Sequence, residues 1–549
     1  MLPFNPRFSR LAFDPATQPL PKRFTFPYYY EPHPLANQAI EELQQYLTEQ
    51  SNTLEDVLHM GRMFGVLVVK DQDGVVGYLS SVSGEKPTAL EKFVPSILDS
   101  TNPELQYIQN KIDNLRCKLD KLNDDPDLHQ LNLELMSIKS ESSIALDSHQ
   151  LRIKEAKKDR KLQRNEAEAE MSPEQLASFI KSLGEQSSQE KRQLKKLKHE
   201  WLKKIAFVEE QLRNQNATVN AQKDACRLEL GKLTKLNLQQ RTFLNQHGIT
   251  QSLYHLFKDN TPLEPIVNSE HENAPKLLQY AFKHQMKPLA LAEFWWGPAP
   301  EKEIRQHKNL YPVCQSKCYE ILNHMLDGIE TDPSPLTVNP AEGKELDIIY
   351  EDDVMVIVNK PEEFLSVPGK TILDSVYTRI KSRYPNATGP LIVHRLDMST
   401  SGLIVLALTS EANRFIQKQF IERTVEKHYV ALLEGEVEEE SGVIKLPLAG
   451  DLSDRPRQLV CFEKGRKAET TWQVLNRIEG RTRVRLYPKT GRTHQLRVHC
   501  AHRLGLNCSI VGDDLYGYKQ DRLHLHAEYL RLIHPVTKKV MAFTADANF

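Results

Sequence analysis

The stretch from Glu104 to Gln246 constrains the fold of this chain more than any other feature. It is rich in Lys, Glu, Gln and Leu and contains only two glycines. Apolar residues recur in it every three or four positions, which is the spacing of the buried face of a coiled-coil helix. The two clearest series are Leu105, Ile108, Ile112, Leu115, Leu119 and Leu122, and Leu194, Leu197, Trp201, Ile205, Val208 and Leu212. The stretch therefore predicts long paired helices.

Two prolines divide this helical stretch. Ser172 and Pro173 have the order of a helix N-cap and a first helical residue, and Pro126 marks another break. The simplest arrangement is an antiparallel coiled-coil hairpin, although a parallel homodimer would show the same pattern. The many lysines could contact phosphates, but acidic residues are interleaved with them, so a solvated helix face is the simpler explanation.

The sequence on both sides of the helical stretch is that of a small α/β domain. The apolar runs 64–69 and 75–79 flank a polar turn that contains Gly74, which predicts a β-hairpin. Residues 275–297 combine an amphipathic helix, an apolar run and an aromatic cluster that core packing explains. Both sides thus contribute elements that need a common core.

These features predict three parts. Residues 1–103 and 248–335 form one split N-terminal α/β domain, and residues 104–247 form a coiled-coil insertion, which a host tolerates when the insert's ends lie close together. After a proline-rich linker, residues 345–549 form a second domain with many short strands and few helices. We therefore expect an α+β fold with a mixed, mainly antiparallel sheet in the second domain.

Composition limits the partners and the cellular compartment that we expect for this protein. The net charge is -1, so any surface for nucleic acid must be local. Seven cysteines, an odd number spread along the chain, argue against a disulfide framework. The N-terminus has prolines and charges but no apolar core of signal-peptide length, and no run is long enough to span a membrane. We expect a cytoplasmic protein.

The strongest candidate for chemistry is Asp397. It stands in a polar segment between two apolar runs, 391–393 and 403–408, with His394 and Arg395 beside it. The runs predict buried strands and the polar segment a loop. A carboxylate next to a buried sheet can act as a nucleophile or base. The alternative is that Asp397 only caps the turn and pairs with Arg395.

Other polar residues gather at strand ends in the same domain. Tyr429 runs into an apolar strand, and Arg497 alternates with Leu496 and Val498 as if on a further strand. An arginine paired with Asp397 would keep the carboxylate ionised, and a tyrosine could stack on a planar substrate or move a proton. Basic residues in these segments suit a polyanion bound through its phosphates. They are Arg395, Lys427, Arg455, Arg457, Lys489 and Arg492.

Seven motifs in this order resemble the RluA family of pseudouridine synthases: NKP, SVPG, HRLDMSTSG, EKHYVALLEG, DRPRQ, GRKAET and GRTHQLRVH, from Asn359 to His499. The tail segments SIVGDDLYG and LHLHAEYLRLIHP continue the resemblance to cover essentially all of residues 345–549. DRPRQ, VCFEKGRKAET and KHYVAL are most similar to the family's dual-specificity type, whose substrates are a tRNA anticodon stem-loop and a 23S rRNA loop. The resemblance implies the pseudouridine synthase fold and an enzyme that isomerises uridines in RNA.

The resemblance also implies roles for residues. Asp397 matches the catalytic aspartate, with attack on the base or on the sugar both possible. Tyr429 matches the tyrosine that stacks on the flipped uracil and helps to remove the C5 proton, and Arg497 the basic residue that pairs with the aspartate. Leu496 matches the aliphatic residue that lines the other side of the base, and Arg395 the arginine that fills the space left by the nucleotide. The RNA-binding set is Arg395, Leu496, His394, Lys427, Arg455 and Arg492.

No cofactor or metal is implied. The histidines His524, His526 and His534 lack carboxylate or cysteine partners at metal-ligand spacing. The long N-terminal part departs from the family's usual plan and could add RNA contacts or form a homodimer through the coiled coil. Two alternatives to a uridine isomerase stay open. One is a coiled-coil RNA-binding or ribosome-assembly factor with a non-catalytic synthase domain, and the other is a hydrolase, which lacks a second acid/base carboxylate.

Overall fold

The computed structural model describes residues 5–12, 18–28, 31–50, 61–84, 90–97, 103–257, 272–452 and 454–549. Parts of the proline-rich N-terminal lead, residues 1–4 and 13–17, lie outside this set. The chain divides into two compact units, one of Met1–Asp99 with Arg241–Phe549 and one of Ser100–Gln240. In the parts that are described, no helix is both long and apolar enough to cross a membrane.

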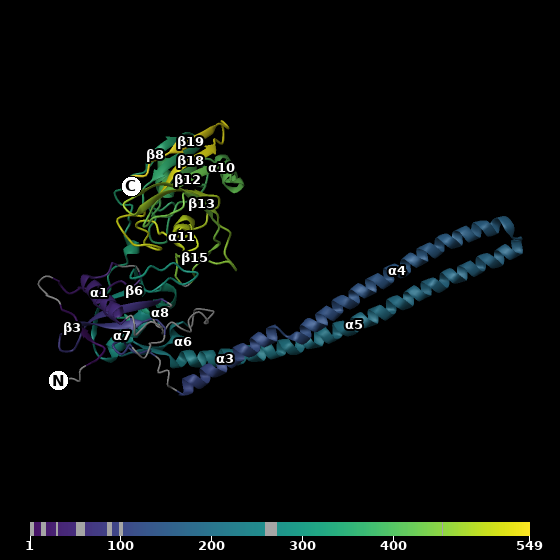
Figure 1. Ribbon diagram of the computed structural model, residues 1–549, viewed down its shortest axis with the longest axis horizontal. Helices are drawn as coiled ribbons and strands as arrows, with labels where there is room; N and C mark the ends of the chain where they lie inside the picture. The colour runs from purple at the N-terminus through teal and green to yellow at the C-terminus, as the bar shows by residue number, and fades with distance from the viewer. Residues whose placement is uncertain are drawn as a thin grey trace. The chain divides into compact units, whose positions relative to one another are not determined.

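The unit Ser100–Gln240 consists of three helices, α3 (Pro103–Asn123), α4 (Pro126–Glu170) and α5 (Pro173–Gln240). Helices α4 and α5 each begin at the proline that the sequence marked as a break, and the Asp125 side chain caps α4 by accepting from the Leu128 N–H at 2.8 Å. Helices α4 and α5 run side by side and antiparallel (Figure 1). Ion pairs join them within one chain, so this pairing needs no second copy.

The first sheet lies in the other unit and has the order β1-β3-β2-β6-β7. The predicted hairpin is present, with Gly74 at a φ of +84° in its turn. Strand β6 pairs antiparallel with β2, so segments from both sides of the helical unit share this sheet. The strands are β1 (Ser9–Arg10), β2 (Arg62–Lys70), β3 (Val76–Val82), β6 (Lys287–Trp296) and β7 (Leu310–Tyr311).

Helices cover both faces of this sheet. Alternate residues of β2 such as Phe64 and Val66 share a core with α1 (Pro34–Glu49), whereas the Gly65 position faces α7 (Asn273–Lys283). Alternation along a strand explains the two layers, because successive side chains point to opposite faces. The remaining elements here are β4 (Thr242–Leu244), β5 (Thr250–Ser252), α6 (Leu253–Leu256) and α8 (Gln315–Met325).

The second sheet is 10-stranded, with the order β13-β16-β17-β12-β18-β11-β9-β8 and with β10 on β11 and β19 on β18. Only the pairing of β11 with β18 is parallel among its described strands, so the sheet is mixed and mainly antiparallel as predicted. Its strands are β8 (Asp347–Glu351), β9 (Met355–Lys360), β10 (Leu391–Ile392), β11 (Ser401–Ala407), β12 (Glu426–Leu433), β13 (Ser441–Ile444), β16 (Thr470–Ile478), β17 (Arg481–Pro488), β18 (Leu525–Ile533) and β19 (Val540–Thr544).

Strands β9 and β11 are buried on both faces. Val356 and Ile404 belong to one core cluster, and their neighbours Ile357 and Val405 belong to another on the opposite face. Burial on both sides explains why these strands are continuous apolar runs in the sequence. The other elements of this part are α9 (Val376–Arg383), α10 (Ser410–Glu422), α11 (Gln495–Ala501), the short helix η3 (Pro335–Thr337), and a two-stranded ribbon of β14 (Leu448–Gly450) and β15 (Gln458–Val460).

The strand expected around Arg497 is wrong, because these residues form helix α11. All seven residues of α11 are buried, the polar ones included, so the alternation of polar and apolar residues that suggested a strand does not mark an exposed and a buried face. Two local features start the helix. His494 has a left-handed φ of +51°, and the Gln495 side chain accepts from the Arg492 N–H at 3.1 Å.

Candidate active site

A cleft of about 1420 Å³ lies at one end of the second sheet. Three segments line most of it: the loop after β10, the residues from the end of α10 into β12, and the turn from β17 into α11. Eight of the nine residues predicted for the site are brought together here. They are Asp397, Tyr429, Arg497, Arg395, Leu496, His394, Lys427 and Arg492. The ninth, Arg455, is exposed on a neighbouring loop whose Pro456 lines the cleft.

The loop that carries Asp397 is held by its backbone. The Leu396 N–H donates to the Ser366 hydroxyl at 3.1 Å, and the same hydroxyl donates to the Leu396 carbonyl at 2.7 Å. The Thr400 N–H donates to the backbone carbonyl of Asp397 at 3.2 Å. Within the described residues, the half-buried Asp397 carboxylate itself has no hydrogen bond or ion pair. It therefore does not cap the turn, and it is open to the cleft.

Lys360 lies beneath this loop and was not predicted as a site residue. Its fully buried ammonium group donates to the carbonyls of Pro361, Phe364 and Met398 at 2.8–2.9 Å. Burial lowers the pKa of Lys360 to about 7, and the nearby negative charges of Glu363 and Asp397 oppose that shift. The NKP motif was the available signal, since a lysine that ends a buried strand needs internal acceptors.

Tyr429 is placed by an irregularity in β12. The pairing of β12 with β18 shifts register between His428 and Val430, which puts Tyr429 at a bulge. Bulges re-aim a side chain and are frequent next to active sites. Burial raises the pKa of the Tyr429 phenol, and the charge of Asp397 raises it further. Tyr429 is thus a protonated, buried phenol close to the Asp397 carboxylate.

Arg497 has a different partner from the one predicted. Its guanidinium binds Asp513 through two bonds, of 2.9 and 2.5 Å, and Asp514 through one of 2.7 Å. Among the described residues it makes no ion pair with Asp397. The side chains of Arg497 and Asp513 are 3% and 0% exposed, so the fully buried carboxylate in this region is Asp513. The two adjacent aspartates of SIVGDDLYG were visible in the sequence, but nothing there linked them to Arg497.

The Arg497–Asp513 pair stays ionised. Burial raises the pKa of Asp513, but the charge and hydrogen bonds of Arg497 outweigh burial and lower it. Both carboxylate oxygens of Asp513 accept from Arg497, and Oδ1 also accepts from the Leu515 and Tyr516 N–H groups at 3.0 and 2.9 Å. The pair therefore fixes α11, and with it Leu496, at the wall of the cleft.

His394 is used within the protein rather than left free for RNA. Its Nε2 accepts from the Val405 N–H at 3.2 Å, and its ring stacks on Phe420 with centroids 4.7 Å apart. The Lys427 ammonium lies 5.7 Å from the same Phe420 ring. Burial, followed by the charge of Lys427, lowers the pKa of His394 to about 3. His394 therefore holds the Asp397 loop against β11 as a neutral imidazole.

The half-buried, neutral His394 predicts a specific pH dependence. Below its ordinary pKa of about 6.5 the unfolded chain takes up a proton that the folded chain does not, so stability falls as pH falls. In the control His394→Gln the amide oxygen still accepts a hydrogen bond. Between pH 6.5 and 5 we expect the free energy of unfolding of the wild type to fall by about 2 kcal/mol more than that of this variant. Urea unfolding at the two pH values measures this. Equal losses in the two proteins would contradict it.

The rim of the cleft is basic. Arg395 and Arg492 are exposed, and Lys489 pairs with Glu469 at 2.8 Å. Arg492 donates to the Lys467 carbonyl at 3.1 Å. In the part of the chain that is described, Arg395 has neither a hydrogen bond nor an ion pair. Arg395 stands two residues before Asp397, and its guanidinium is the side chain at the rim most available to a polyanion.

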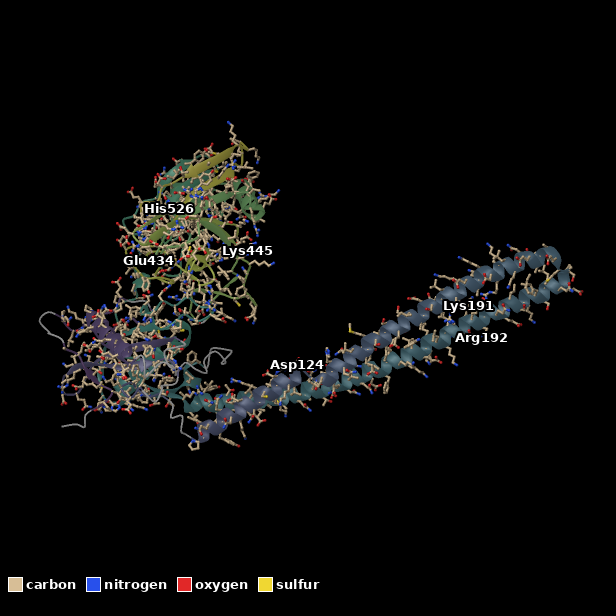
Figure 2. The ribbon with its side chains drawn as sticks, in the orientation of Figure 1. Asp124, Lys191, Arg192, Glu434, Lys445 and His526 are labelled. Carbon is tan, nitrogen blue, oxygen red and sulfur yellow. The ribbon has the colours of Figure 1, made fainter. Side chains whose placement is uncertain are left out.

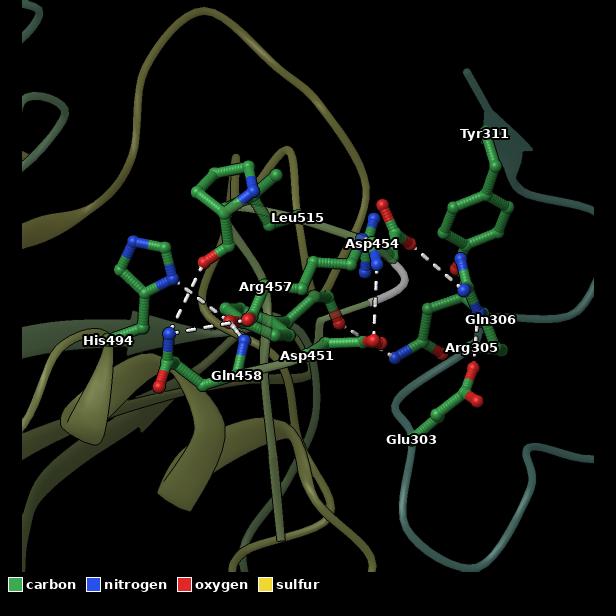
Figure 3. Close-up of polar contacts among 12 residues, drawn as sticks. Glu303, Arg305, Gln306, Tyr311, Asp451, Asp454, Arg457, Gln458, His494 and Leu515 are labelled. Carbon is green, nitrogen blue, oxygen red and sulfur yellow. Dashed lines mark hydrogen bonds and ion pairs between the residues drawn. The ribbon is translucent and has the colours of Figure 1, made fainter. Parts of the chain in front are cut away.

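Residues before the second sheet support the loop that carries Arg455. Arg305 donates to Asp454 at 3.0 Å, and Arg457 binds the same carboxylate oxygen at 3.1 Å (Figure 3). The Gln458 N–H donates to the hydroxyl of Tyr516 at 2.7 Å, and this hydroxyl also lies 2.9 Å from His494 Nδ1. A chain of polar contacts thus joins the segment around Arg305 to the turn that starts α11.

Comparison with known proteins identifies this arrangement. Residues 354–502 match the RNA pseudouridylate synthase family. The dual-specificity RNA pseudouridine synthase RluA of Pasteurella multocida is 44% identical over 222 residues, which cover 39% of this chain and 99% of that protein. The chain belongs to the RNA pseudouridine synthases. RluA of Escherichia coli K12 is 45% identical over 219 residues, which cover 38% of this chain and 97% of that protein.

Membership in this family makes the chain an isomerase that acts on RNA uridines. The solved structure of human RNA pseudouridylate synthase domain containing 1 is 28% identical, covering 39% of this chain and 86% of that one, with a TM-score of 0.32. The family resemblance drawn from the seven motifs is confirmed. The similarity covers well under half of this chain. It lies in the part that forms the second sheet, and the helical unit and the first sheet are outside it.

Proposed function

We propose that this enzyme isomerises a uridine in a tRNA anticodon stem-loop, in a 23S rRNA loop or in both, with Asp397 as its nucleophile. The observation that carries the proposal is the Asp397 carboxylate, which is held by its backbone, opens into the cleft and lies near a buried Tyr429. The dual-specificity name of the most similar relatives supports the choice of RNA.

The proposed reaction uses residues from each wall of the cleft. The target nucleotide leaves its stack, Arg395 fills the space it vacates, and Leu496 and Tyr429 hold the base between them. Asp397 attacks the flipped uridine, the bond from N1 to C1′ breaks, and the base turns so that C5 bonds to C1′. Asp397 is then released, N1 takes up a proton, and the C5 proton is lost through the Tyr429 hydroxyl, which passes on its own proton as it takes this one. Uridine and pseudouridine are isomers, so no other reactant is consumed.

The remaining predicted residues support the RNA or the site. Lys427, Arg455 and Arg492 contact phosphates around the cleft, while His394 positions the Asp397 loop. Arg497 acts through α11, which it anchors to Asp513, and not through an ion pair with Asp397. We also propose that residues 104–247 form a coiled coil inserted into a split domain of residues 1–103 and 248–335, that 345–549 are the catalytic domain, and that the protein works in the cytoplasm.

Mapping pseudouridine in total tRNA and rRNA from cells with and without the protein tests the function. We expect pseudouridine to disappear from an anticodon stem-loop or a 23S rRNA loop in the cells that lack it, and to return with the wild-type chain. The alternative of a non-catalytic RNA-binding or assembly factor predicts no lost site and no turnover by purified protein on either RNA. An open carboxylate in a formed cleft argues against that alternative.

A further inference from the structure

Positive charge is concentrated in one part of the helical unit. Residues 151–164 of α4 and 190–204 of α5 hold 14 Lys and Arg residues and four Asp and Glu residues, in a chain whose net charge is -1. We name these two runs the basic band. The adjoining residues 165–189 have the opposite balance, with five Glu and one Lys, as do residues 126–150, with four Asp and Glu and one Lys. The charge is therefore segregated along the helices.

The antiparallel pairing brings the two runs to the same level. Arg160 binds Glu190 at 2.6 Å, and Lys139 binds Glu209 at 2.8 Å. Residue numbers along α4 therefore fall as those of their partners along α5 rise. This register sets most of 151–164 beside the start of the second run. Half-buried apolar residues such as Ile153 and Leu194 face the partner helix, and most lysines of both runs are exposed. Figure 2 shows Lys191 and Arg192 on this part of α5.

Helix stability does not account for the basic band. Like charges four residues apart destabilise a helix, and the band contains several such pairs, including Lys157 with Lys161 and Lys191 with Lys195. Of its 14 basic side chains, only Arg160 and Arg164 form an ion pair with a carboxylate among the described residues. The other 12 basic side chains form no ion pair among the described residues, and the four acidic residues of the band are too few to balance their mutual repulsion. Binding of a polyanion would remove that repulsion.

We propose that the basic band binds the phosphates of an RNA double helix. A run of 14 helical residues extends roughly 20 Å, long enough to follow several phosphates along a duplex. Lysines on two parallel ridges give a line of point charges, which suits backbone binding and carries no base readout. The inference rests on RNA being the substrate of the family, and not on the uridine or the catalytic roles proposed above. It gives the helical unit the role of holding duplex RNA outside the cleft.

The test is the affinity of the full chain for a labelled RNA duplex of about 20 base pairs made only of G and C, measured by fluorescence anisotropy at several salt concentrations. Such a duplex contains no uridine, so its binding is independent of catalysis. The band variant replaces Lys191, Arg192, Lys195 and Lys196 by Gln. The matched control replaces four lysines of the same helical unit outside the band, Lys118, Lys121, Lys223 and Lys232, by Gln.

We expect the band variant to bind the duplex at least about tenfold more weakly near physiological salt, with the slope of log K against log salt reduced by about 3. The control should stay within about twofold, although its change in charge is the same. Both variants should keep the helical circular dichroism of the wild type, because Gln is a good helix former. Asp397→Ala should bind the duplex as the wild type does.

Three results would overturn the proposal. Equal weakening of both variants would show a general charge effect, and no weakening of either would place duplex binding elsewhere. Binding of the wild type to vesicles containing phosphatidylglycerol, without binding to the duplex, would assign the band to a membrane surface. If any of these results is found while pseudouridine formation is intact, the catalytic proposal stands. If duplex binding is intact but neither proposed RNA is modified, only the catalytic proposal is contradicted.

Discussion

Asp397→Ala should lower pseudouridine formation by about 10⁴-fold or more, because loss of a group that bonds to the substrate removes the reaction path and not only a binding contact. The side chain has no hydrogen bond or ion pair among the described residues, and its loop is held by Ser366 and by backbone bonds. Removing the carboxylate therefore leaves the loop intact. Single-turnover assays on an anticodon stem-loop and on a 23S rRNA hairpin measure the rate.

Asp397→Asn is the matched control, since the amide keeps the size and polarity of the carboxylate but not its charge. We expect the Asn variant to be as inactive as the Ala variant, and both to bind the stem-loops within about threefold of the wild type, because a neutral side chain also removes repulsion from phosphates. Substantial turnover by either variant would show that another group is the nucleophile. Loss of binding together with turnover would show that Asp397 supports the cleft.

The loop of Asp397 was predictable because β11, the strand that follows it, is buried on both faces. Double burial leaves an unbroken apolar run, which marks β11 in the sequence without an alignment. The helices α4 and α5 were predictable for a similar reason. A regular apolar spacing and prolines at Pro126 and Pro173 give both their type and their first residues.

The identity of the partner of Arg497 was not predictable in the same way. Helix α11 is short and wholly buried, so neither its length nor its polarity pattern distinguishes it from a strand. Read as a strand, the segment sends Arg497 to the face opposite Leu496 and Val498, and the pairing with Asp397 was implied by the family resemblance. Read as the helix that it is, the segment turns the guanidinium onto Asp513, which follows in the SIVGDDLYG segment. A partner set by tertiary packing has no signature in local spacing.

The same limit applies to the contacts that hold the Arg455 loop. Asp454 and Arg457 were visible as parts of DRPRQ, but Arg305 is far from them in the sequence. Nothing in its surroundings marks it as a partner of that loop. The motif did predict where this loop lies. Its Pro456 lines the cleft, and Asp454 and Arg457, on either side of Pro456 in the sequence, pair with each other. Motifs thus indicated where the site lies, and long-range charge pairs decided how it is held.

Asp513→Ala should lower the free energy of unfolding of the catalytic part by about 3–5 kcal/mol, because breaking a buried pair leaves Arg497 uncompensated. The carboxylate also accepts the N–H groups of Leu515 and Tyr516, so the turn that holds Tyr516 loses two acceptors. Asp514→Ala is the matched control. Its side chain is 28% exposed and makes one bond to Arg497, so we expect a loss of about 1 kcal/mol or less. Urea unfolding of both variants gives the comparison.

The reverse variant, Arg497→Met, separates charge from packing. In the wild type the pKa of Asp513 is lowered, so its contribution to stability is present above the ordinary carboxyl pKa of about 4 and is lost below it. In the variant, burial without the guanidinium raises that pKa, so the folded protein takes up a proton as pH falls from neutral toward 4. The stability gap between wild type and variant should therefore narrow over this range. If the difference in free energy of unfolding between wild type and variant is constant with pH, Arg497 supports α11 by packing, and its charge does not stabilise the ionised Asp513.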